Sequence, residues 1–190
     1  MTLTEPAIYV QHYYQEDVSI PLEKIVPRVM LFALLLLIIP LLIYALLWGQ
    51  LPLNYSFEIL PVFVIMIVLH ELIHAIGWKV AGGLRWQDLK FGFSWRGLSP
   101  YCHAKAPMTA QAYRVGTILP GIITGLIPAL TGIITHDSFL TFLGAILIAG
   151  AVGDLYVLWI IRKVSSDVLL LDHPSQAGCI VLHEKLMPSD

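Results

Sequence analysis

The stretch VLHELIHAIGW, residues 68–78, places two histidines and a glutamate inside an otherwise apolar run. It belongs to a segment, 59–79, that is long enough to cross a bilayer, which takes about 20 mostly apolar residues. A charged acid near the centre of such a span costs at least ~2.5–3.5 kcal/mol on insertion scales, and it persists mainly where it has a partner. Partners for these side chains are therefore expected at the same membrane depth in the other spans.

The composition indicates an integral membrane protein. The chain has 190 residues, of which 57% are hydrophobic and 13% charged, with a mean hydropathy of +0.78. Ordinary soluble domains are about 45–50% apolar and about 25% charged. The formal charge of −2 provides no basic stripe for nucleic acid, so we expect no nucleic-acid partner. Two cysteines are too few for a disulfide framework.

Four segments have the length and apolarity of membrane spans. They cover residues 29–49, 59–79, 113–135 and 139–161. We predict an all-α membrane protein of four transmembrane helices, organised as a single domain over residues 1–190. The third span is rich in glycine and proline, and we considered both a loose, gate-like wall and close helix packing through small residues.

The positions of the basic residues predict the orientation in the bilayer. All eleven fall outside the two loops at 50–58 and 136–138, and therefore on one side of the four spans: Lys24, Arg28, Lys79, Arg85, Lys90, Arg96, Lys105, Arg114, Arg162, Lys163 and Lys185. Cytoplasmic loops carry the excess of lysine and arginine. We expect both termini in the cytoplasm and a multi-pass protein of the cell membrane, in contact with the lipid bilayer.

The opening stretch has the spacing of a metal site. His70, Glu71 and His74 form H-E-x-x-H, and on a helix the positions i and i+4 share one face, so both imidazoles can reach one ion. Glu71 lies one residue further round, where it can act on a water bound to that metal. The alternative is that the three side chains only form interhelical hydrogen bonds, which would not require this spacing.

Asp154 is the best candidate for a third ligand. It is the only acid within the first, third and fourth spans. At a rise of about 1.5 Å per residue, it lies at a depth between those of His70 and His74, counted from the basic end of each span. His103, in the cytoplasmic segment PYCHAK, is the rival ligand, although a solvated histidine is the commoner explanation there.

The segment 86–106 between the second and third spans resembles a β-hairpin. Two extended runs, WQDLKFGFSW and LSPYCHAKA, flank Arg96-Gly97, and a glycine beside a polar residue between β-rich runs is a hairpin signal. We expect it to emerge at the cytoplasmic face just beyond the metal, where an exposed edge could take up an unwound substrate strand. A simple interfacial loop is the alternative.

HELIHAIGWKVAGGLRWQDLKFGFSW, a hydrophobic HExxH followed by a glycine-containing hairpin, resembles the site-two protease class of intramembrane zinc metalloproteases. More closely, the four-span layout, the last span and the DHPSQAG tail at 172–178 resemble the small bacterial membrane proteins of the putative zincin peptidase family. The resemblance implies zinc bound by His70, His74 and Asp154, and Glu71 as catalytic acid and base. It also implies a bacterial cell membrane and a substrate that is itself a membrane segment. The Asn-Pro-Asp-Gly run usual around the third ligand of site-two proteases is here AVGDLY, 151–156.

The expected chemistry is hydrolysis of a peptide bond in or near a membrane segment by a zinc-activated water, with Glu71 as general base and then acid. The rival from another class is a divalent-cation transporter, which also buries histidine and acid at mid-membrane. A membrane scaffold that binds metal without proteolysis is the third option. Against a transporter, the first and third spans carry no internal charge to continue a pathway.

Overall fold

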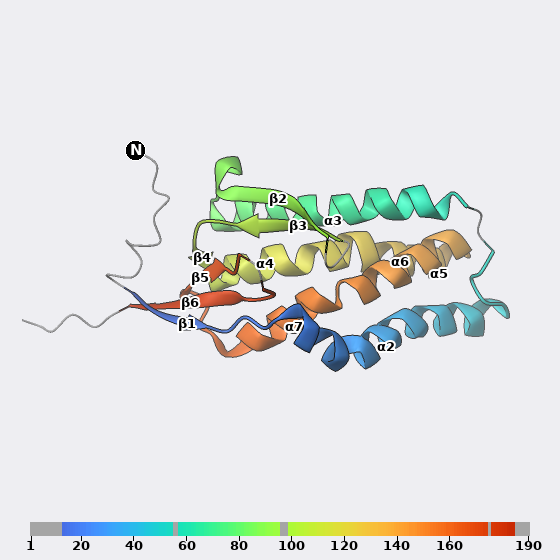
Figure 1. The fold of residues 1–190 in the computed structure, drawn as a ribbon. Coiled ribbons are helices and arrows are strands. Elements are labelled where there is room, and N and C mark those ends of the chain that lie inside the picture. Colours follow the sequence, from blue (N-terminus) through green and yellow to red (C-terminus); the bar gives the residue numbers. More distant parts are fainter. Residues whose placement is uncertain (1–12, 55–56, 96–98, 175, 185–190) are drawn as a thin grey trace, which may run out of the picture.

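Four long helical segments form the molecule, with small sheets at one end (Figure 1). The computed structural model describes residues 13–54, 57–95, 99–174 and 176–184. The first two segments are single helices, α2 (Leu22–Trp48) and α3 (Ile59–Gly82). The third runs through α4 (Ala110–Pro120), the π-helix η2 (Gly121–Leu126) and α5 (Ile127–Thr135). The fourth runs through α6 (Ser138–Gly150), α7 (Val152–Ile160) and the 3₁₀ turn η3 (Ile161–Lys163).

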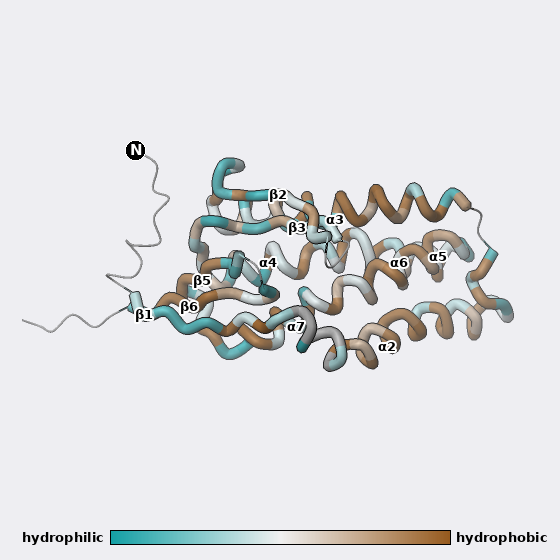
Figure 2. Tube along the Cα trace, in the orientation of Figure 1, coloured by the Kyte–Doolittle hydropathy of each residue, from teal (hydrophilic) through white to brown (hydrophobic). Residues whose placement is uncertain are grey.

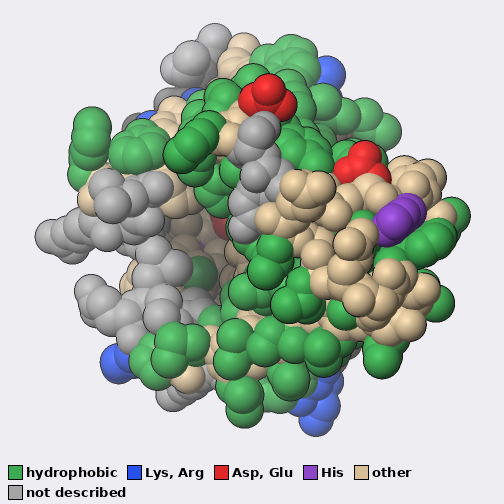
Figure 3. Space-filling model, turned by 90° about the vertical axis from the view of Figure 1, so that its right-hand side faces the viewer, with side chains coloured by type: hydrophobic (Ala, Val, Ile, Leu, Met, Phe, Trp, Pro, Cys, Tyr) green, Lys and Arg blue, Asp and Glu red, His purple; other side chains and the backbone are tan. Residues whose placement is uncertain are grey.

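These four segments are long and apolar enough to cross a membrane, over Val29–Trp48, Ile59–Gly82, Ala110–Thr135 and Ser138–Lys163. The bounds agree with the predicted spans to within a few residues. Only 11% of the most apolar part of α2 and of α3 is buried inside the protein, so most of their apolar side chains are exposed. Figure 2 shows long hydrophobic stretches along both helices. Such exposed apolar helix surfaces suit lipid. Figure 3 views the molecule from the end opposite the sheets, where hydrophobic side chains are mixed with other types and the acidic and histidine side chains are isolated spots.

The third and fourth segments are irregular where they pass the polar residues of α3. A π-helix over Gly121–Leu126 follows Pro120, which has no backbone N–H to donate, and π-bulges are frequent at functional sites. The fourth segment is not one straight helix as expected, because α6 ends at Gly150 and α7 begins at Val152. Asp154 therefore lies in the first turn of a new helix, where the positive end of the helix dipole favours an acid.

The glycines of the third segment bring the helices into close contact. A Cβ at Gly77 of α3 would lie 2.7 Å from Gly116 Cα, and one at Gly116 would overlap the Trp78 ring. A Cβ at Gly125 would lie 2.7 Å from an Ile148 side-chain carbon of α6. These contacts agree with close packing through small residues, the second of the two roles considered for this span.

Two antiparallel sheets accompany the helices, so the expectation of an all-α protein with one hairpin is incomplete. The expected hairpin is present as β2 (Leu89–Ser94) and β3 (Ser99–Ala104), after a short 3₁₀ turn at Trp86–Asp88, while the predicted turn Arg96-Gly97 lies outside the described residues. The second sheet was not predicted. It has the order β1-β6-β5-β4, formed by Tyr13–Asp17, Cys179–Glu184, Leu169–Asp172 and Met108–Thr109.

The second sheet joins the two ends of the chain. Strand β1 pairs with β6 in the register Tyr13 to Glu184, and β5 pairs with both β6 and β4. Both ends of the described chain therefore lie at the same end of the helices, to the left in Figure 1. The main core cluster includes Trp78, Ala104, Tyr113, Ile161 and Val181. It thus connects the sheets to the ends of α3, α4 and α7.

Candidate metal centre

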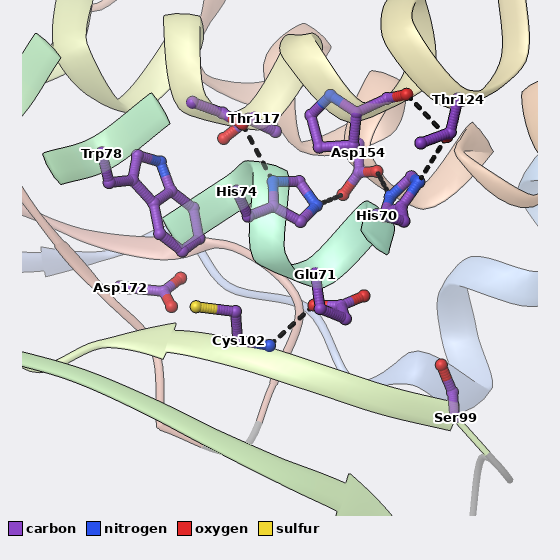
Figure 4. Close-up of polar contacts among 12 residues, drawn as sticks. His70, Glu71, His74, Trp78, Ser99, Cys102, Thr117, Thr124, Asp154 and Asp172 are labelled. Atoms are coloured by element: carbon purple, nitrogen blue, oxygen red, sulfur yellow. Dashed lines mark hydrogen bonds and ion pairs between the residues drawn. The ribbon is translucent and has the colours of Figure 1, made fainter. Parts of the chain in front are cut away.

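The structure brings all four predicted site residues together. His70 Nε2 lies 3.1 Å from Asp154 Oδ2, and His74 Nε2 lies 3.5 Å from Asp154 Oδ1. Figure 4 shows the carboxylate of α7 between the two rings of α3. One possible ligand atom each of His70, Glu71 and His74 also lies within 4.8 Å of the other two. The level predicted for Asp154 from residue counting is therefore confirmed.

The third segment fixes the orientation of both imidazoles. His74 Nδ1 lies 2.9 Å from the carbonyl oxygen of Gly116, which can only accept, so this nitrogen carries the proton. His70 Nδ1 lies 3.3 Å from Thr124 Oγ1. Thr124 donates its own hydroxyl proton to the Pro120 carbonyl at 2.7 Å, so its oxygen accepts from His70. Both rings therefore have Nδ1–H, which leaves a lone pair on each Nε2.

Three groups of lone pairs consequently face one another: the two Nε2 atoms and the Asp154 carboxylate. This arrangement is favourable only when a cation lies between them, either protons on the rings or a metal ion. Two histidines and one carboxylate are a donor set of catalytic zinc. The contacts of 3.1 and 3.5 Å reach different oxygens of Asp154, so its carboxylate lies between the two Nε2 atoms. The residues present therefore fit zinc.

Glu71 points toward the hairpin (Figure 4). Its Oε2 accepts a hydrogen bond of 2.7 Å from the backbone N–H of Cys102 in β3. The hairpin thus folds back along α3 to the level of the histidines, instead of projecting beyond the metal as expected. It does so because the apolar side chains of Leu89, Cys102 and Ala104 are buried in the core that α3 shares.

The edge of β3 that faces the site already uses its donors. Cys102 donates to Glu71, and the N–H of Ala104 donates to Asp172 Oδ2 at 3.2 Å. The remaining outward position of this strand is Pro100, which has no N–H. A substrate strand that paired with this edge would have to replace both bonds.

A cavity of about 530 Å³ opens beside the site. Glu71, His74 and Asp154 line it on one side, and the hairpin and the turn between β5 and β6 line it on the other. Such a volume falls in the range of small-molecule and peptide pockets. The turn is held at its base by a bond of 3.1 Å from His173 N–H to the Gly178 carbonyl.

Asp172, in the wall of this cavity, was missed by the sequence analysis. It accepts hydrogen bonds from His103 Nδ1 at 2.9 Å, from the Tyr113 hydroxyl at 2.9 Å and from Ala104 N–H. His103 is thus paired and largely buried, whereas a solvated loop histidine was the expected reading. The sequence signal was the DHPSQAG tail, in which the aspartate precedes a turn at the end of a short apolar run.

The two cysteines are free and buried. Burial raises the pKa of the Cys102 thiol to about 12, and the carboxylates of Glu71 and Asp172 act in the same direction. Burial likewise raises the pKa of Cys179 to about 12. The thiolate is the nucleophilic form of cysteine, so both thiols are protonated and unreactive at neutral pH.

The chain is similar to known proteins over the segment that contains the site. The family model described as "Putative zincin peptidase" matches residues 63–169, more than half of the chain, including all four site residues. A protein of Pyrococcus woesei described as "Uncharacterized 24.7 kDa protein in gap 5'region" is 29% identical over 131 residues, 66% of this chain. The match covers 57% of that protein's length. No solved structure matches the chain significantly.

Proposed function

The chain belongs to the putative zincin peptidase family, and we propose that it is an intramembrane zinc metalloprotease. Its reaction is hydrolysis of a peptide bond in or beside a membrane segment of another protein or peptide. Its location is the cell membrane of a bacterium, with both termini in the cytoplasm. The reaction is supported by the site, the membrane location by the four apolar helices, and the orientation by the placement of the basic residues. The bacterial source follows from the resemblance to small bacterial membrane proteins.

One observation carries the proposal: both Nε2 atoms and the Asp154 carboxylate converge with their lone pairs, while each Nδ1 is held by a group of the third segment. Second partners of this kind fix ring orientation in metal sites and raise the basicity of the ligand. Packing alone would not place three acceptors against one another in a low-dielectric site.

In this mechanism His70, His74 and Asp154 hold the metal. When bound, zinc lowers the pKa of a coordinated water toward ~7 and polarises the scissile carbonyl. Glu71 takes the proton from the attacking water and then delivers it to the leaving amine. The Cys102 N–H orients the Glu71 carboxylate for this exchange, because it holds Oε2 at 2.7 Å and leaves Oε1 to the water.

The proposal is tested by comparing new peptide termini in membranes of cells that express the wild type or Glu71→Gln. Glutamine keeps the shape of the side chain and cannot take the proton, so cleavage should fall by at least the ~10²–10⁴-fold that general acid–base catalysis contributes. Fragments cut within or next to a membrane segment should appear only with the wild type, and they would identify the substrate.

The zinc content of the purified proteins provides the control. Glu71→Gln should retain zinc, whereas Asp154→Ala should bind it more weakly because one ligand of three is removed. Equal sets of termini from the wild type and Glu71→Gln, with equal zinc, would argue against proteolysis. Metal flux in vesicles would then distinguish a transporter from a scaffold.

A further inference from the structure

We propose that the cavity binds a lysine or arginine side chain of the substrate at Asp172, about two residues from the scissile bond on the side of the sheets. The inference names the substrate class of the proposed reaction and rests on the proposed function. Asp172 acts in binding and takes no part in the chemical step. Its uncompensated charge, its position relative to Glu71 and the membrane topology support the assignment.

The Asp172 carboxylate has hydrogen bonds but no basic side chain beside it. It is 13% exposed and accepts from His103 Nδ1, from the Tyr113 hydroxyl and from the N–H of Ala104. Among the described residues that line the cavity there is no lysine or arginine. A buried charge is normally paired with an opposite charge or with a metal ion. Asp172 therefore lacks the partner that its burial calls for.

Lys90, a lysine of the same hairpin, does not fill this role. It lies opposite His103 in the register of β2 and β3. Its side chain is exposed, however, and it is not among the described residues of the cavity wall. Within the described part of the chain it forms no ion pair with Asp172. The carboxylate can therefore bind a cation that enters the cavity.

His103 adds a second acceptor to this wall. The Asp172 carboxylate can only accept, so the proton of their 2.9 Å contact lies on His103 Nδ1, and a neutral ring keeps a lone pair on Nε2. Nε2 has no hydrogen-bond partner among the described residues, and His103 lines the same cavity as Asp172. Ammonium and guanidinium groups have several N–H donors and no acceptor. A negative charge beside a lone pair therefore suits a lysine or an arginine.

Strand β3 fixes the separation between Asp172 and Glu71. Cys102 N–H donates to Glu71 at 2.7 Å, and Ala104 N–H donates to Asp172 at 3.2 Å. Alternate residues of a strand direct their N–H groups to the same side, and at a rise of about 3.3 Å per residue they lie about 6.6 Å apart. The two carboxylates therefore lie along one edge of β3. A substrate whose scissile bond is at Glu71 places a residue about two positions away beside Asp172.

A column of stacked rings connects Asp172 to the metal centre by a second route. His74 stacks on Trp78 with ring centroids 5.3 Å apart, and Trp78 stacks on Tyr113 with centroids 5.7 Å apart. The Tyr113 hydroxyl then donates to Asp172 at 2.9 Å. All four residues line the cavity of about 530 Å³ together with Glu71. One bound peptide can therefore contact both Glu71 and Asp172.

The membrane topology explains why a substrate has a basic side chain there. Strand β3 runs toward β4 and the four-stranded sheet, so Asp172 lies nearer the sheets than Glu71 does (Figure 1). The basic residues of the chain indicate that the sheets face the cytoplasm. A membrane segment of another protein in the same bilayer also has its excess of lysine and arginine on that side. The expected substrate is thus a membrane segment with a basic residue at its cytoplasmic boundary.

The test measures binding to the full-length Glu71→Gln protein in detergent, which requires no turnover. The probes are fluorescent leucine–alanine membrane peptides with lysine, norleucine or glutamate at one position, scanned along the cytoplasmic boundary. At one position the lysine peptide should bind at least about tenfold more tightly than the norleucine peptide, as expected for a hydrogen bond to a charged group. The glutamate peptide should bind more weakly than both. Equal binding of the lysine and norleucine peptides at every position would overturn the proposal.

Asp172→Asn, added to Glu71→Gln, should abolish the preference for lysine. Asp167→Asn is the matched control, because it removes one negative charge from the same end of the molecule at an exposed residue outside the described cavity wall. It should keep the full preference. A preference that survived Asp172→Asn would show that another group binds the cation. Thermal unfolding and zinc content verify that the variant is folded, and if it is not, the peptide comparison with Asp172 intact decides the question.

Cleavage of the same peptides by the wild type keeps this inference separate from the proposed function. The bond that is cut should lie about two residues from the lysine, on its membrane side, because the two N–H groups of β3 have that separation. A lysine preference in binding without cleavage of any peptide would count against the proposed function and leave the lysine site standing. Cleavage with no dependence on the lysine would count against the lysine site alone.

Discussion

Each imidazole that faces Asp154 is oriented by one atom of the third helical segment. His70 is held by the Thr124 hydroxyl in the π-helix, and His74 by the Gly116 carbonyl of α4. His74 is buried and also stacks on Trp78, with ring centroids 5.3 Å apart. The cost of placing polar rings at this depth is offset by these bonds, each of which leaves Nε2 directed at Asp154. Orientation, and not only the presence of two histidines, defines the site.

Thr124→Val should lower zinc affinity by about 10–100-fold, the usual effect of removing an outer partner of a ligating histidine. Valine has nearly the shape of threonine, but it offers no oxygen to His70 Nδ1. The ring is then free to rotate and its basicity falls. Competition with a fluorescent zinc chelator measures the change.

Thr135→Val is the control for this substitution. Thr135 forms the same type of bond to the carbonyl four residues earlier, at 2.8 Å from Thr131, but it is exposed and lies at the end of α5. The zinc affinity of the Thr135→Val protein should equal that of the wild type. An affinity of Thr124→Val that also equals the wild type would show that Thr124 does not orient His70.

Helix pairing determines where the site can form. Helices α3 and α4 approach closely at Gly77 and Gly116, so Gly116 can offer its carbonyl to His74 while Trp78 covers its Cα. The break between α6 and α7 lets Asp154 start a new helix beside them. Arg114 caps the C-terminal end of the fourth segment, because its guanidinium donates to the carbonyls of Ile161 and Val164. Small side chains and interrupted helices thus position the ligands.

Gly116→Ala should destabilise the protein and weaken zinc binding. The added methyl group would overlap the Trp78 ring, and overpacking of this kind costs typically about 1–3 kcal/mol. Because Trp78 stacks on His74, relief of the overlap would displace the ligand. Thermal unfolding in detergent and the zinc content after purification measure the two effects.

Gly150→Ala is the matched control, because a Cβ at Gly150 meets no atom within 4 Å. It should have the stability and zinc content of the wild type. If Gly116→Ala behaved in the same way, the α3–α4 contact would be looser than the structure indicates.

At the scale of the whole molecule, the polar parts gather at one end. The hairpin, the four-stranded sheet and both described chain ends lie there (Figure 1). Residues of the hairpin and of the turn that follows β5 line the cavity. In the part of the chain that the structure describes, the opposite end holds the short connections between α2 and α3 and between α5 and α6. The sequence of these connections, 49–58 and 136–137, contains no lysine or arginine. The positive-inside rule therefore predicts that the sheets and the cavity face the cytoplasm.

Labelling with a membrane-impermeant maleimide tests this orientation. The two native cysteines should react little with the maleimide, because both are buried and the pKa of each is raised to about 12. Few thiolates therefore exist near pH 7. Asn54→Cys, on an exposed loop position, should react in intact cells. Ser165→Cys, exposed at the other end, should react only after the membrane is permeabilised. The reverse pattern would place the cavity outside.

The sequence by itself determined the features that depend on a regular pattern within one segment. Each span is recognised from its own length and apolarity, and the shared face of His70 and His74 follows from the helical period. The depth of Asp154 followed from the same regularity, because a constant rise per residue places residues of different spans at comparable levels. The hairpin was indicated by its own composition, although its position along α3 was not.

Only the tertiary structure decided the contacts between distant segments. The ring nitrogens that face Asp154 depend on Gly116 and Thr124, which are 42 and 54 positions from the histidines they bind. The pairing of β1 with β6 and of His103 with Asp172 joins segments whose separation no local pattern records. The local sequence gives little indication of short strands and single hydrogen bonds, because their stability comes from the packing of the elements around them. The proximity of His70, His74 and Asp154 could thus be predicted from the sequence, whereas the orientation of the rings and the wall of the cavity could not.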